Sequence, residues 1–124
     1  MQTELFPIRN YIETHKTNIH SRPKTILTVA GGKDYNDYQF TYFAVIELLH
    51  CNSVSNSIDI MQTSRVKLPR YLTAVTFDPN TNITSTNNNI LLAVGCMRGY
   101  FILFNVEIID YQQFKVTQLN QIKL

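Results

Sequence analysis

ILTVAGG at residues 26–32, followed by TYFAVIEL at residues 41–48, has a second version later in the chain: LLAVGC at residues 91–96, followed by GYFILFNVE at residues 99–107. Each version is an apolar run that ends in small residues, then a turn, then a second apolar run opened by Tyr-Phe. Two such runs joined by a turn are typical of a β-hairpin. The chain therefore predicts a duplicated hairpin, and repetition of one all-β unit is typical of architectures whose units bury their faces against their neighbours.

The duplication predicts that residues 24–124 are almost wholly antiparallel sheet, with the Tyr-Phe pairs at 42–43 and 100–101 in equivalent places. A helix over residues 43–49 is the main alternative, because several residues there tolerate helical backbone. The corresponding stretch 100–106 is dominated by β-branched and aromatic residues, which favours a strand in both copies. Five residues are predicted to form the core: Phe77, Leu92, Val94, Ile102 and Phe104.

Composition limits the class of protein. The chain has 124 residues, of which 44% are hydrophobic and 11% aromatic, enough for one domain with a core. Only 16% are charged and the net charge is +2, far from the basic balance of a dedicated nucleic-acid binder. Cys51 and Cys96 are too far apart in sequence, and too isolated, to indicate a disulfide framework or a zinc site. Without a signal sequence or an apolar run of about 20 residues, we expect an intracellular protein, cytoplasmic or nuclear.

The first predicted element is an irregular arm at residues 1–23, which contains a short helix or strand at 8–14. About seven strands follow, punctuated by a turn at Gly31-Gly32, a polar turn at 51–57 and a turn at 78–80. Residues 80–89, rich in Asn, are predicted to be a flexible loop. The predicted strands lie at 26–30, 40–49, 58–61 with 66–68, 72–77, 90–94, 100–106 and 114–119.

Residues 71–107 resemble one WD40 repeat. The apolar stretch 71–80 ends in Phe77-Asp78-Pro79, similar to the Phe-Ser-Pro turn that ends the first strand of a WD40 blade. Residues 92–95, Leu-Ala-Val-Gly, resemble the Leu-Ala-Ser-Gly of the second strand, and Phe104-Asn105 stands at the place of the Trp-Asp pair. Residues 24–68 resemble the last three strands of a preceding blade. The Trp and the Gly-His dipeptide of the family are absent, so such blades would be held mainly by packing.

The resemblance implies an all-β protein with one partial blade at 24–68 and one complete blade at 69–124, both within a propeller-like segment 24–124. Closed propellers have at least about four blades, and single repeats need neighbours on both sides. Three alternatives follow: the chain is a piece of a longer protein, it completes a propeller with other chains, or it closes on itself as a small sandwich or roll. The expected function is a non-enzymatic protein-interaction scaffold whose partners are other protein chains.

Residues that could carry chemistry are few. His50 and Cys51 are adjacent and would point to opposite faces of a strand. His15 and His20 do not have the spacing of a helical metal pair, and Gly31-Gly32 lacks the rest of a phosphate-binding loop. We therefore expect no catalytic residues, metal or cofactor. An enzyme whose catalytic residues lie outside these 124 positions has no feature in its favour.

In the blade geometry that the resemblance implies, the connection between the second and third strands of a blade and the connection between blades emerge on one rim. Asp34 and Asp37 belong to this rim, together with cationic and aromatic residues of the types enriched in binding hot spots. A solvated polar rim is the plain alternative, and a nucleic-acid module that contacts phosphates through the same cations is another. The predicted partner-binding residues are Lys33, Tyr35, Tyr38, Arg65, Lys67, Arg70 and Arg98.

Overall fold

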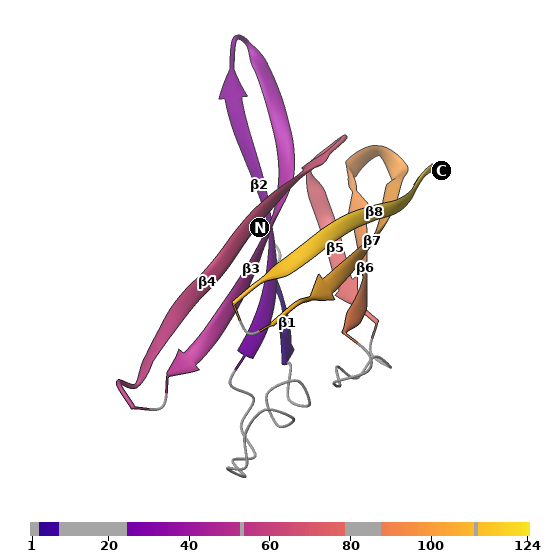
Figure 1. The fold of residues 1–124 in the computed structure, drawn as a ribbon. Coiled ribbons are helices and arrows are strands. Elements are labelled where there is room, and N and C mark those ends of the chain that lie inside the picture. The colour runs from indigo at the N-terminus through magenta and orange to yellow at the C-terminus, as the bar shows by residue number, and fades with distance from the viewer. Residues whose placement is uncertain (1–2, 8–24, 53, 79–87, 111) are drawn as a thin grey trace.

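The structure, a computed structural model, describes residues 3–7, 25–52, 54–78, 88–110 and 112–124. It consists of two four-stranded antiparallel sheets, in which the strands follow one another in sequence order (Figure 1). The first sheet contains β1 (Thr3–Pro7), β2 (Thr25–Asn36), β3 (Gln39–Asn52) and β4 (Ser57–Leu68). The second contains β5 (Leu72–Phe77), β6 (Asn89–Cys96), β7 (Tyr100–Ile108) and β8 (Phe114–Lys123), with a 3₁₀ turn, η1 (Met97–Gly99), between β6 and β7. The predicted all-β class is confirmed.

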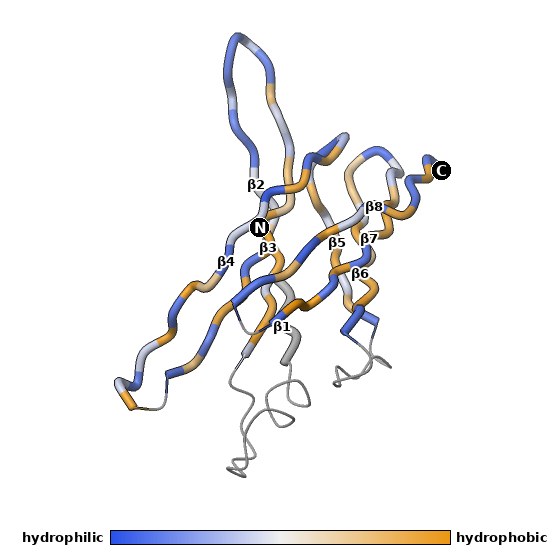
Figure 2. Tube along the Cα trace, viewed as in Figure 1, coloured by the Kyte–Doolittle hydropathy of each residue, from blue (hydrophilic) through white to orange (hydrophobic). Residues whose placement is uncertain are grey.

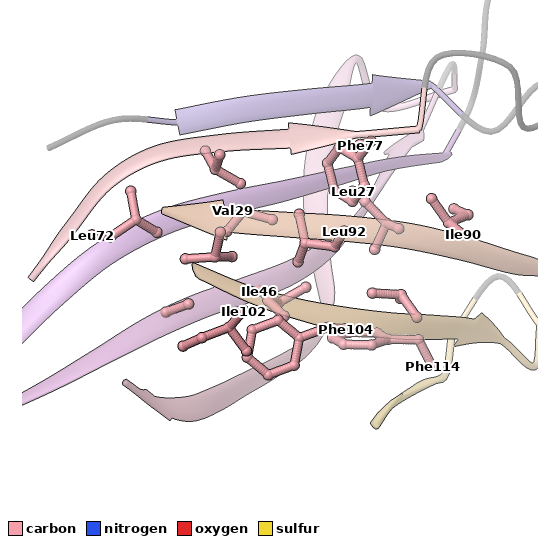
Figure 3. Close-up of a cluster of buried hydrophobic side chains, with 14 of the residues drawn as sticks. Leu27, Val29, Ile46, Leu72, Phe77, Ile90, Leu92, Ile102, Phe104 and Phe114 are labelled. Atoms are coloured by element: carbon pink, nitrogen blue, oxygen red, sulfur yellow. The ribbon is translucent and has the colours of Figure 1, made fainter. Parts of the chain in front are cut away.

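The two sheets lie face to face and share one hydrophobic core (Figure 3). Buried and partly buried positions alternate along β2, as expected when one face of a strand points into a core. Leu27 and Val29 of the first sheet belong to the same buried cluster as Leu92 and Phe104 of the second. All five predicted core residues are buried. Figure 2 shows the consequence: apolar residues alternate with polar ones along the strands.

The duplicated phrase occupies the two middle strands of each sheet. Its first copy forms β2 and β3, and its second copy forms β6 and β7. Tyr42 and Tyr100 both pack against the core cluster, so the next residues, Phe43 and Phe101, point to the outer faces. The predicted equivalence of the two Tyr-Phe pairs is confirmed, and residues 43–49 form strand rather than helix.

The prediction of a turn at Gly31-Gly32 is wrong, because both residues lie inside β2. A Cβ at Gly31 would lie 3.0 Å from the Cβ of Leu72 on β5, and a Cβ at Gly32 would lie 2.3 Å from the Phe43 ring. These glycines therefore permit close packing on both faces of the strand. The chain turns later, at Asp37 and Tyr38.

The N-terminal arm also differs from its prediction. Thr3–Pro7 form a strand that pairs antiparallel with β2, so the first sheet has four strands and the described residues form eight in all. Five residues are too few for a periodic signal, and their pairing follows from the edge of β2, which offers unpaired backbone groups. The element predicted at 8–14 lies outside the described residues, as do His15, His20 and most of the predicted loop at 80–89.

A side-chain amide joins the edge strands of the two sheets. Gln62 on β4 donates through Nε2 to the carbonyl oxygen of Phe114 at 2.9 Å, and the backbone N–H of Phe114 donates to Gln62 Oε1 at 2.8 Å. The amide thus pairs with the start of β8 much as a neighbouring strand would. On the opposite side of the sandwich, β5 lies against β1 and β2.

Candidate interaction surface

Three chain connections lie at one end of the sandwich, which we call the rim end: the β2–β3 turn, residues 69–71 between the sheets, and η1 (Figure 1). Direct contacts join them. The backbone N–H of Met97 donates to the carbonyl oxygen of Tyr71 at 2.9 Å, and Lys33 Nζ lies 5.8 Å from the centroid of the Tyr71 ring. The residues predicted to share a rim are therefore placed at one end of the molecule.

A two-stranded arm projects from the first sheet at this end. The pairing of β3 with β4 stops at Tyr42 and Leu68, whereas β2 and β3 continue to pair as far as Asn36 and Gln39. We call residues 33–42 the hairpin arm. Three of its rings are exposed to solvent, with exposed fractions of 58% for Tyr35, 92% for Tyr38 and 52% for Phe40. Aromatic rings outside a core normally mark a surface that meets a ligand or partner.

The tip of the arm is strained. Asp37 and Tyr38 form the two-residue turn with φ values of 51° and 61°, the signs required by a type I′ turn. Such turns favour Asn, Asp and Gly, and the Cβ of another residue in this conformation costs about 1–2 kcal/mol. Tyr38 therefore occupies a position where glycine would be more stable.

A row of four rings runs along one face of the arm to its base, and we call it the aromatic ladder. The ring centroids of Tyr35 and Phe40 are 4.8 Å apart, those of Phe40 and Tyr42 are 6.2 Å apart, and those of Tyr42 and Tyr71 are 6.3 Å apart. Lys33 Nζ lies 5.4 Å from the centroid of Phe40, within the range of a cation–π contact. The ladder is thus a continuous aromatic surface that carries its own cation.

The opposite face of the arm holds a different arrangement. The guanidinium carbon of Arg65 lies 3.6 Å from the centroid of the Phe43 ring, and Arg65 Nη2 lies 3.3 Å from Asp34 Oδ2. Lys67 is the cross-strand neighbour of Phe43 and shares its face. The structure therefore divides the predicted residues: Lys33 and Tyr35 lie on the ladder face, Arg65 and Lys67 on the outer face.

The remaining predicted residues flank the second sheet. Arg70 is exposed between the sheets, and Arg98 is exposed in η1 with a φ of 67°. A further cation joins them, because the backbone N–H of Leu124 donates to the Gly99 carbonyl at 2.8 Å and Lys123 Nζ lies 5.4 Å from the centroid of the Tyr100 ring.

Sequence reasoning missed Phe40, Tyr71 and Lys123. The period-two spacing of Phe40 and Tyr42 could have indicated a shared face. Tyr71 immediately precedes the predicted strand at 72–77, which is β5, and no local pattern distinguishes it. Lys123 could not have been found, because β8 was predicted to end at residue 119.

Charge is segregated along the molecule. From residue 25 onward the chain has seven Lys and Arg residues and seven Asp and Glu residues. Among these acids only Asp34 and Asp37 lie on the hairpin arm, whereas Asp59 lies near the start of β4, Asp78 follows β5 and Asp110 lies between β7 and β8, all at strand ends away from the rim end. Such a separation creates a positive potential that attracts anionic ligands to the rim end. The six cations there are Lys33, Arg65, Lys67, Arg70, Arg98 and Lys123.

Groups capable of covalent or metal chemistry are sparse in the described part of the chain. Burial raises the pKa of the Cys96 thiol, and a backbone hydrogen bond with Arg70 opposes this shift more weakly. The thiol is therefore protonated, and a poor nucleophile, at neutral pH. No cluster of three or more His, Cys, Asp or Glu side chains within the described residues could hold a metal ion.

The outer face of the second sheet carries exposed apolar residues beside polar ones such as Asn105, Glu107 and Lys115. Small residues lie on it near the η1 end, where Ala74 pairs with Gly95 and Gly95 pairs with Phe101. Leu91, Phe101 and Ile122 on this face are exposed. Among the described residues, no second layer covers this face.

Comparisons with protein-family models, curated proteins and solved structures gave no match for this sequence. Within the described ranges, no helix has the length and apolar character needed to cross a membrane.

Proposed function

We propose that this protein is a non-enzymatic protein-interaction scaffold, whose outer face on the second sheet packs against an antiparallel sheet of a partner protein. The observation that carries the proposal is the row of apolar residues that runs across the four strands of this face: Ala74, Gly95, Phe101 and Ile122. Exposed patches of this kind mark interaction sites in soluble proteins. The partner's sheet would bury this face as the first sheet buries the opposite one.

The arrangement of the two sheets supports this proposal. Each sheet is a four-stranded meander in sequence order, which is the strand order of a propeller blade, and the two are stacked face to face. The resemblance of residues 71–107 to a WD40 repeat points the same way. A third sheet on the outer face would extend a stack that already has two layers.

The test is co-purification from cell extract with three forms of the chain: wild type, Phe101→Asp and Tyr35→Asp. Phe101→Asp introduces a charge on the outer face of the second sheet, whereas Tyr35→Asp introduces the same charge on the hairpin arm of the first sheet. We expect a protein retained by wild type and Tyr35→Asp but lost from Phe101→Asp, with equal melting temperatures for the purified forms. Equal capture by all three forms would contradict a role for the outer face. A wild-type dimer that Phe101→Asp dissociates would identify the partner as a second copy.

The rim end supports a second candidate function, a nucleic-acid module that contacts phosphates. The rim end has six cationic residues and two acidic ones, and this local excess of positive charge favours the function, although the net charge of the whole chain is only +2. Arg70 and Arg98 are exposed, and arginine pairs well with phosphate. Binding through such contacts weakens steeply as salt is raised. A salt-independent affinity for nucleic acid would contradict it.

A further inference from the structure

We propose that the aromatic ladder and the rim cations bind single-stranded nucleic acid, with bases stacked on Tyr35 and Phe40 and phosphates held by Arg70, Arg98 and Lys123. This inference rests on the second candidate function and specifies its ligand. It uses a surface separate from the outer face of the second sheet.

The rings provide a stacking surface. Successive centroids are 4.8, 6.2 and 6.3 Å apart, so the ladder is one continuous row rather than a set of isolated side chains. Its two outermost members, Tyr35 and Phe40, are more than half exposed. Stacking of bases on aromatic side chains is independent of base identity, because every base has a flat π face.

The charges around the ladder favour an anionic ligand. Lys33 lies over the ladder itself, and Asp34 is turned to the other face of the arm, where it pairs with Arg65. The cations of the ladder face therefore have no acidic neighbour on the arm except Asp37 at its tip. A positively charged surface combined with a row of aromatic rings is the arrangement that single-strand binding proteins use.

A single strand fits this surface better than a duplex. The bases of a duplex stack on one another, so their faces are closed to the rings of Tyr35 and Phe40. An acidic polypeptide would satisfy the cations but has no regular series of flat groups for the ladder. The ladder thus distinguishes between ligands that the charges alone would accept.

The experiment measures binding of a fluorescein-labelled 12-nucleotide thymidine oligonucleotide by anisotropy at several salt concentrations. The chain has seven Tyr and no Trp, so quenching of its intrinsic emission reports directly on tyrosine. Tyr35→Ser with Phe40→Ser should weaken binding by at least about tenfold, because each stacked base contributes roughly 5- to 100-fold. The slope of affinity against salt should stay unchanged. Ile60→Ser, which alters an equally exposed apolar residue away from the rim end, should have no effect.

Arg98→Ala should instead reduce the salt slope by about one, as expected for the loss of one phosphate contact. If an abasic oligonucleotide or polyglutamate binds as tightly as the thymidine oligonucleotide, the stacking proposal is overturned. Binding of a phosphate-containing or acidic ligand by the cations would still stand. Absence of oligonucleotide binding by wild type at 50 mM salt would overturn both it and the second candidate function. Neither result would touch the outer-face proposal, which is tested by Phe101→Asp.

Discussion

The two sheets contain copies of the same hairpin sequence, but the phenylalanine of the Tyr-Phe pair has different surroundings in each sheet. In the first sheet the Phe43 ring lies over Gly32 and beneath the Arg65 guanidinium, and only 8% of the residue is exposed. In the second sheet Phe101 lies beside Gly95 and is 39% exposed. The fourth strand makes the difference, since β4 supplies Arg65 and β8 supplies no long cation at that place. Similar strands thus become a covered face in one sheet and an open face in the other.

The hairpins at the rim end differ in a related way. β6 and β7 stop pairing at Cys96 and Tyr100 and are joined by the three residues of η1. β2 and β3 continue beyond the sheet and form the hairpin arm. The first sheet therefore carries its exposed aromatic residues on the hairpin arm. The second sheet carries an exposed aromatic residue, Phe101, on its outer face. The two proposed ligands follow this division.

The largest expected effect concerns the shared core. Phe104 and Ile46 occupy matching places, three residues after the Tyr-Phe pair, as cross-strand neighbours of Leu92 and Val29. Phe104→Ala should cost about 3–5 kcal/mol and Ile46→Ala about 2–5 kcal/mol of unfolding free energy, because each removes a buried side chain. Urea denaturation measures both. A loss below about 1 kcal/mol for either variant would mean that the sheet concerned does not depend on this core.

The next prediction contrasts the two outer faces through a matched pair of glycine substitutions. Gly32→Ala would place a Cβ 2.3 Å from the Phe43 ring, whereas Gly95→Ala would place one no closer than 3.7 Å to Ala74. Displacing the covered ring should cost about 1–3 kcal/mol. Gly95→Ala should be neutral or stabilising by up to about 1 kcal/mol, because it restricts the unfolded chain. Equal costs in thermal melts would remove the distinction between covered and open faces.

A smaller effect is expected at the amide that joins the sheets. Gln62→Leu leaves the backbone N–H and C=O of Phe114 without this partner, which should cost about 1–2 kcal/mol for partly buried groups. Gln118→Leu, on the exposed part of β8, is the control and should change stability by less than about 0.5 kcal/mol. If both variants melt together with wild type, the joint between β4 and β8 contributes nothing to holding the sheets.

The smallest effect has the opposite sign. Tyr38→Gly should stabilise the fold by about 1 kcal/mol, because glycine adopts the φ of 61° without steric cost. Arg98→Gly, with a φ of 67° in the other hairpin, should act in the same direction. Differential scanning calorimetry detects such a shift in a protein of this size. Destabilisation by Tyr38→Gly would show that the tyrosine packs on the arm instead of standing in solvent.

The sequence by itself determined the all-β class, the two middle strands of each sheet and the five predicted core residues. These features depend on the local alternation of apolar and polar residues and on apolar content, both of which are visible in a short stretch of sequence. It also grouped the predicted site residues near one end, although Lys33 and Tyr35 lie within β2, and Arg65 and Lys67 within β4, and not on connections. Phe40 could have been predicted as well, because the same alternation determines which face of the strand it occupies.

Only the tertiary structure decided which face each side chain serves and what covers it. Thr3–Pro7 became a strand because β2 had a free edge, and Gly31 and Gly32 became packing positions because Leu72 and Phe43 approach them. Arg65 lies on the outer face, where it contacts Phe43 and Asp34, because β4 pairs with β3 in the register that places it opposite Val45. Each of these outcomes depends on a partner strand or on residues far along the chain, and local periodicity carries no information about which distant segment arrives.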